Sequence, residues 1–230
     1  MTVFKYAVFR NFQSPLSLFA TSIVPILLMF LMPEVWTYAP ASGITFLAMM
    51  MMLSSYLITG LVLEDRIDGV IIRVLVAPIR TISYIAQNLL ASIIPLLIQI
   101  LLLGIIGFLR YNWSIELTVG ITIAFMLFAF ATTAFSFCWN MFFKSKEGSR
   151  YAYMLVGAVI AVLSGIMIPN EALPNFLQDV GAIFHPYWLI RSLNSLTLYG
   201  INTDFWLYQG IVMLFAIAFL LLGGTRRTTE

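Results

Sequence analysis

Six long apolar runs divide this chain and leave only short polar segments between them. They lie at Leu16–Met32, Gly43–Leu63, Ile82–Leu109, Leu117–Asn140, Tyr151–Ile168 and Phe205–Leu222. About 20 apolar residues in a helix cross the ~30 Å hydrocarbon core of a bilayer. Within lipid the backbone must satisfy its own hydrogen bonds, so such runs fold as helices. We therefore expect residues 1–230 to form one all-α, polytopic membrane domain with six transmembrane helices.

The distribution of lysine and arginine predicts how these helices are oriented. Charged residues make up only 10% of the chain. Ten of the twelve basic residues lie in the N-terminal segment, the loops after the second and fourth runs, and the tail, whereas only Arg110 and Arg191 lie on the opposite side. Basic loops stay on the cytoplasmic side of a membrane. We expect a multi-pass protein of the cytoplasmic membrane with both termini in the cytoplasm.

The apolar runs lack the groups that would make this chain an enzyme or an ion-coupled transporter. No Asp or Glu lies near the middle of a run, and the only histidine, His185, lies between the fifth and sixth. Intramembrane carboxylates and histidines are the usual proton and ion carriers. The sequence also has no phosphate-binding P-loop and no zinc-protease motif. We expect a non-catalytic transport protein in the lipid bilayer, with no cofactor and no nucleic-acid partner, powered by another chain. The roles of His185 and Cys138 stay open.

The segment before the first run has the pattern of an interfacial helix. In Thr2–Ser14, Phe4, Val8 and Phe12 share one helical face, while Lys5 lies elsewhere on the helix. A helix with this pattern lies flat at the membrane surface. It is either a simple anchor or a lever that contacts a cytoplasmic partner.

The loop after the second run carries the most organised charge pattern in the chain. An acidic and basic cluster ends the run, and Gly69 then permits a turn. Val70–Val76 is predicted to form a short amphipathic helix with Arg73 on its polar side, ended by Pro78. A loop this short has little to do except contact something at the membrane surface.

A second organised segment separates the fifth and sixth runs. After Ser164-Gly165, Leu173–Phe184 has apolar residues at helical spacing, and His185-Pro186 interrupts it. An apolar segment that is too short to span the membrane indicates re-entrant or interfacial helices on the external side.

The loop Arg66–Pro78, RIDGVIIRVLVAP, resembles that of ABC-2 type permeases, the membrane subunits of a class of ATP-binding-cassette (ABC) exporters. Their pattern is roughly Arg-Glu-x-Gly-Thr-x-x-x-Leu-x-x-x-Pro, often with Asp before the Gly. The matching residues are Arg66, Asp68, Gly69, Arg73, Leu75 and Pro78. Ile67 and Val70 depart from the pattern. The segment from Ser164-Gly165 through Pro169 and Pro174 is similar to a second signature of these permeases, which precedes their last span.

The resemblance implies a complex of two permease chains, identical or different, and two ABC ATPase subunits that hold ATP and Mg²⁺. ATP-driven closure of the ATPases would press on the N-terminal helix and on the loop after the second span. The residues implied to couple the chain to the ATPase are Phe4, Phe12, Glu64, Asp65, Arg66, Asp68, Gly69, Arg73 and Pro78.

In such permeases the second and fifth spans line the central cavity. The substrate pathway is therefore expected at Met49, Met50, Met52 and Tyr56, and the external gate at Gly165, Pro169, Pro174 and Pro186. Methionine adapts to varied apolar ligands, although a methionine run also suits ordinary helix packing.

The apolar, methionine-rich pathway indicates export of a hydrophobic or amphipathic compound, such as a drug, an antimicrobial peptide or a lipid-like metabolite. Two alternatives stay open. One is a polysaccharide or glycolipid export permease, and the other is a non-transporting immunity or sensor subunit built on the same scaffold.

Overall fold

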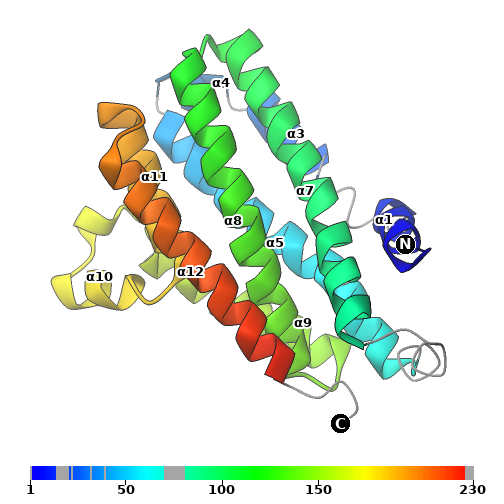
Figure 1. Ribbon diagram of the computed structural model, residues 1–230. Coiled ribbons are helices and arrows are strands. Elements are labelled where there is room, and N and C mark those ends of the chain that lie inside the picture. The colour runs from blue at the N-terminus through cyan, green and yellow to red at the C-terminus, as the bar shows by residue number, and fades with distance from the viewer. Residues whose placement is uncertain are drawn as a thin grey trace.

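The computed structural model describes residues 2–13, 21, 23–31, 33–38, 40–69 and 81–225, and the regular structure in these ranges is helical. Figure 1 shows a bundle of long helices with shorter helices at its sides. In chain order the elements are α1 (Thr2–Gln13), α3 (Val24–Leu31), α4 (Pro33–Tyr38), α5 (Pro40–Ile67), α7 (Thr81–Tyr111), α8 (Ile115–Met141), α9 (Lys146–Leu163), the 3₁₀ turn η2 (Asn170–Ala172), α10 (Asn175–Gly181), α11 (His185–Tyr199) and α12 (Thr203–Thr225).

Among the described residues, four helices are long and apolar enough to cross a membrane. These candidate spans are Gly43–Ile67 in α5, Ala86–Tyr111 in α7, Ile115–Met141 in α8 and Thr203–Gly224 in α12. They correspond to the second, third, fourth and sixth runs of the sequence. Helix α8 lies at the centre and contacts α5, α7, α11 and α12 (Figure 1). The fold is therefore a helical membrane bundle organised around α8.

The first predicted span and the predicted loop helix lie partly or wholly outside the described residues. The described part of Leu16–Met32 contains α3, a helix of eight residues. The predicted helix Val70–Val76, with Arg73, lies outside the described residues, as does Pro78. Helix α5 ends before this loop, and Gly69 adopts a left-handed φ of 68° that glycine tolerates best.

The fifth predicted span, Tyr151–Ile168, is wrong at its C-terminal end, because the helix there ends at Leu163. Helix α9 stops at Leu163 because Gly165 adopts a left-handed φ of 85°. The Ile166 N–H then donates to Ala161 O at 3.0 Å and the Gly165 N–H donates to Val162 O at 3.3 Å, which is a Schellman cap. Three of the first five residues of α9 are charged. The apolar part that remains rises only about 20 Å, which is short of the hydrocarbon core.

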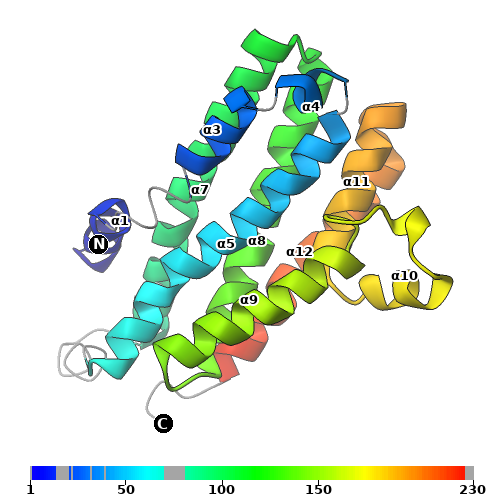
Figure 2. The same cartoon turned by 180° about the vertical axis from the view of Figure 1, so that it is seen from behind.

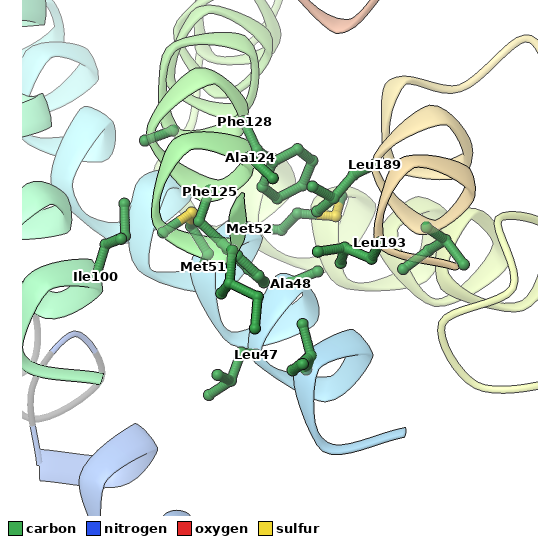
Figure 3. Close-up of a cluster of buried hydrophobic side chains, with 14 of the residues drawn as sticks. Leu47, Ala48, Met51, Met52, Ile100, Ala124, Phe125, Phe128, Leu189 and Leu193 are labelled. Atoms are coloured by element: carbon green, nitrogen blue, oxygen red, sulfur yellow. The ribbon is translucent and has the colours of Figure 1, made fainter. Parts of the chain in front are cut away.

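A continuous apolar core joins the spans to α11. Figure 3 shows side chains of α5, α7, α8 and α11 converging on one cluster. The labelled members are Leu47, Ala48, Met51 and Met52 of α5, Ile100 of α7, Ala124, Phe125 and Phe128 of α8, and Leu189 and Leu193 of α11. Leu189 and Phe128 are completely buried. Because α11 contributes buried side chains, it is part of the bundle rather than a surface element.

A hydrogen-bonded network of small polar side chains joins α5, α8 and α9 inside this apolar bundle. Asn140 of α8 is fully buried, donates to Thr59 Oγ1 at 3.2 Å and accepts from Ser149 Oγ at 2.8 Å. The hydroxyl of Tyr56 also donates to Ser149 Oγ, at 3.2 Å. We call these four residues the polar network. Each member is satisfied by another, so their burial is compatible with an apolar surrounding.

Helix α11 begins in the middle of the bundle. The ring of His185, at its first residue, lies 5.4 Å from Phe128, 5.3 Å from Phe135 and 5.6 Å from Phe219. At the other end of α11, the Ile201 N–H donates to Glu116 Oε1 at 2.8 Å, at the start of α8. Helix α11 therefore runs from mid-bundle to the end where α8 begins, and α10 precedes it beside α9 (Figure 2). The sequence predicts an interruption of the external segment at His185-Pro186, and in the structure α11 begins there.

The close approach of α10 to α9 gives a first prediction. A Cβ added at Gly181 would lie 2.2 Å from the carbonyl oxygen of Leu163, whereas one added at Gly210 would meet nothing within 4 Å. We expect Gly181→Ala to lower the free energy of unfolding by about 1–3 kcal/mol, because one helix end must move. Gly210→Ala is the control and should not destabilise. Thermal unfolding in detergent measures both, and equal melting temperatures would contradict the packing.

Candidate functional site

The charged residues that end α5 bind the turn between α8 and α9. The guanidinium of Arg66 donates to Met141 O at 3.0 Å and to Phe143 O, so it satisfies carbonyls at the end of α8. Glu64 forms an ion pair with Lys146 at 3.4 Å, between half-exposed side chains. We call this end of the bundle, which also holds Lys144 and Arg150, the basic end. Arg66 is thus bound within the chain, and its predicted role toward an ATPase stays a prediction.

Helix α1 lies across the side of α7 near the basic end (Figure 1). Its Phe4 N–H donates to Gln87 Oε1 at 3.1 Å, and Ala7 is buried. The predicted apolar face, which includes Phe4 and Phe12, is half-buried. On the other side Tyr6 and Phe9 are 68% and 61% exposed. The predicted N-terminal helix is confirmed, and it presents a second aromatic face to its surroundings.

One ion pair fixes α1 to the end of α5. Arg10 Nη1 lies 2.6 Å from Asp65 Oδ2, and the side chains are 22% and 12% exposed. Arg10 Nη2 also donates to Asn88 Oδ1 at 3.2 Å, and the Tyr84 hydroxyl donates to Asp65 Oδ2 at 2.6 Å. We call Arg10, Asp65, Tyr84 and Asn88 the Arg10 cluster. It ties α1, α5 and α7 together, so that a force on α1 reaches the end of α5.

An open cavity of about 440 Å³ surrounds the Arg10 cluster. The predicted coupling residues Glu64, Asp65 and Asp68 line it together with Tyr6 of α1. Asp68 is exposed, beside Gly69. The structure therefore brings the N-terminal helix and the acidic end of α5 to one surface. Sequence reasoning missed Arg10, Tyr84 and Asn88 as members of the cluster. Their partners on other helices lie far away in the sequence, and no local pattern distinguishes these three residues.

A second cavity, of about 210 Å³, lies between α5 and α9. Its lining from α5 is Met49, Met50, Met52 and Leu53, and its lining from α9 is Tyr153, Met154, Gly157 and Ala158. We call it the α5–α9 cavity. No charged residue lines it in the part of the chain that the structure describes. Three of the predicted pathway residues line this cavity. Its walls come from the second and fifth predicted spans, which were expected to line the substrate pathway.

The fourth predicted pathway residue, Tyr56, lies outside the α5–α9 cavity. Its ring stacks on Tyr153 with centroids 4.2 Å apart, and its hydroxyl belongs to the polar network. Tyr153 in turn donates to Met52 O at 2.9 Å and contacts Ser136 Oγ at 3.1 Å. The floor of the cavity is therefore held by hydrogen bonds that connect α9 to α5 and α8.

A third and larger cavity, of about 570 Å³, lies where α5 meets the segment after α9. Gly165 and Pro169, two of the predicted gate residues, line it, as do Met49 and Asn170. We call it the Asn170 cavity. Pro174 precedes α10 and Pro186 lies in the first turn of α11, and neither is among its lining residues. Met49 lines both this cavity and the α5–α9 cavity, so the two adjoin.

The described residues hold no cluster of three or more His, Cys, Asp or Glu side chains that could bind a metal ion. Their arrangement is instead that of a polytopic helical membrane protein with a cluster of charged and polar groups at one end and apolar cavities along α5. Comparison with known protein families matches residues 11–224 to the family described as ABC-2 family transporter protein. The chain therefore belongs to this family, which confirms the resemblance seen in its motifs. No curated protein matches the chain.

Family membership makes the chain a membrane transport component of an ABC transporter, and it implies association with an ABC ATPase and with the membrane. The family is a transport component and not a catalytic one.

The Arg10 cluster gives a second prediction. Of the two described partners of the Asp65 carboxylate, Arg10→Met leaves only the Tyr84 hydroxyl. We expect a loss of about 1–3 kcal/mol of stability and faster amide hydrogen exchange in residues 2–13, because a partly buried charge loses its partner. Lys146→Met is the matched control, since it removes the exposed Glu64 pair and should cost less than about 1 kcal/mol. Unchanged exchange in α1 would contradict the role of the pair.

Proposed function

We propose that the chain is the permease subunit of an ABC exporter that moves a hydrophobic or amphipathic compound out across the cytoplasmic membrane. A separate ATPase subunit binds ATP and Mg²⁺ and supplies the energy. The basic end faces the cytoplasm, since positively charged loops are retained there. Two permease chains, identical or different, face each other across the transport pathway.

The proposed class of transported compound rests on the residues that line the α5–α9 cavity. Methionine and small apolar residues form most of its wall, and Tyr153 is its only aromatic lining residue among those described. A pathway for polysaccharide or glycolipid needs aromatic platforms and hydrogen-bonding acids, which these residues do not offer. An adaptable apolar wall fits a drug, an apolar peptide or a lipid-like compound.

The proposed energy route begins at α1 and at the end of α5. Both present exposed groups at the basic end, and the Arg10 cluster makes them move together. Because α5 also forms one wall of the α5–α9 cavity, a tilt of α5 at its basic end changes the shape of that cavity. This is the rigid-element type of switching that transporters use.

The proposed topology completes six crossings. The first uses the segment that contains α3, and the fifth uses α9 extended by the residues after Leu163. Helices α10 and α11 are re-entrant from the external side. The mid-bundle position of His185 supports this topology, because a surface helix would not begin beside Phe128 and Phe219.

The test is reconstitution with ABC ATPases. We expect the tagged chain to co-purify with one of them and, in proteoliposomes, to export a fluorescent amphipathic compound with ATP. Gly157→Phe should fill the α5–α9 cavity, since the space beside Gly157 is open, and should lower export roughly tenfold without loss of ATPase association. Gly210→Phe on α12, where space is also open, is the control. Failure of every ATPase to associate would overturn the exporter, and association without export would favour an immunity or sensor subunit.

A further inference from the structure

One polar atom in the Asn170 cavity has no partner. The side-chain oxygen Oδ1 of Asn170 is buried and makes no hydrogen bond among the described residues. The residue as a whole is only 6% exposed. A buried acceptor without a partner costs about 1–3 kcal/mol, so proteins rarely retain one without a reason. Asn170 is also a lining residue of the cavity, so this acceptor belongs to the cavity wall.

The surroundings of this oxygen are fixed. A Cβ at Gly165 would lie 2.8 Å from Asn170 Oδ1, so only glycine leaves the amide in its place. The same glycine supplies the left-handed turn that ends α9. Asn170 lies in the 3₁₀ turn η2, whose last backbone bond runs from the Leu173 N–H to Asn170 O at 3.0 Å. The amide is therefore positioned by backbone structure on both sides.

The other residues that line the cavity are either apolar or polar and uncharged. Phe46, Met49 and Met167 supply apolar surface, and Thr45 and Asn194 supply the other polar side chains. No charged side chain is among the described lining residues. A cavity of about 570 Å³ has the size of a small-molecule site. It suits a neutral molecule with an apolar body and one polar group.

We propose that the Asn170 cavity is a binding site for an amphipathic compound whose neutral head group donates a hydrogen bond to Asn170 Oδ1. The apolar part of the compound lies against Phe46, Met49 and Met167. Since Met49 also lines the α5–α9 cavity, the compound occupies the continuation of that pathway. This inference rests on the proposed export function and adds to it a chemical requirement on the cargo, a hydrogen-bond donor.

The experiment uses two amphiphiles that differ by one N–H, N-dodecylacetamide and its N-methyl derivative. The full chain carries Cys138→Ala, which removes its only thiol, and Met167→Cys, at a lining residue that is 59% exposed. Alkylation of this thiol by a maleimide dye is measured in lipid nanodiscs. We expect N-dodecylacetamide to slow labelling about fivefold more than its N-methyl derivative does.

Two further variants assign the effect to Asn170. Asn170→Leu should abolish the difference between the two amides, and Asn175→Leu, at an exposed residue outside the cavity, should leave it intact. A thiol introduced by Leu198→Cys, on the exposed face of α11, should show no protection by either amide. Protection at both thiols alike would indicate an effect of the lipid and overturn the site.

Equal protection of the Met167→Cys thiol by both amides, or a difference that survives Asn170→Leu, would also overturn the proposal. So would a thiol that is unreactive before any amide is added, because a second copy of the chain would then cover the cavity. The assay needs no ATPase. Its failure with export intact would refute only the Asn170 site, and its success without export would refute only the proposed function.

Discussion

Hydrogen bonds between buried polar side chains determine where α9 lies, and the cavities depend on that position. Helix α9 carries an apolar outer surface and is too short to cross the hydrocarbon core alone. Apolar contact gives little preference for one position, because lipid chains are as apolar as leucine. Ser149 and Tyr153 provide that preference by bonding to α8 and to α5. Tyr153, one of these two anchors, also lines the α5–α9 cavity.

Helix α5 connects the two parts of the molecule that the proposed function requires. Its 28 residues extend about 42 Å, from the cavities to the basic end. Asp65 near its end belongs to the Arg10 cluster, Thr59 belongs to the polar network, and Met49 lines both apolar cavities. A helix is stiff along its axis, so displacement at one end is transmitted to the other. In the proposed function, α5 is therefore the element through which the ATPase acts on the cavities.

Much of this architecture follows from the sequence because lipid imposes simple rules on apolar runs. The runs that became α5, α7, α8 and α12 were located to within a few residues, and the helix at Thr2–Gln13 was predicted from the spacing of Phe4, Val8 and Phe12. The fifth run was extended past Gly165 because hydropathy does not register a left-handed residue. Ser164-Gly165 is, however, a recognisable helix-ending pair.

The site was less accessible to sequence reasoning, because its contacts join distant parts of the chain. Arg10 and Asp65 are 55 residues apart, and nothing in either segment indicates that they pair. The sequence also does not show which residues of the methionine run face the core and which face a cavity. Met51 is buried in the core while Met49 lines the cavities, and the choice depends on the rotation of α5 about its axis. His185 lies among mid-span rings because α11 folds back into the bundle, which no local pattern specifies.

The most direct test of the account is the number of molecules exported per ATP hydrolysed when the end of α5 is altered at Gly69. Its φ of 68° disfavours a β-branched residue, whereas asparagine tolerates it, and a Cβ there meets nothing within 4 Å. We expect Gly69→Val to lower this ratio while ATP hydrolysis by the complex continues, and Gly69→Asn largely to preserve it. Export by Gly69→Val at the unaltered ratio would contradict the claim that the energy enters through the end of α5.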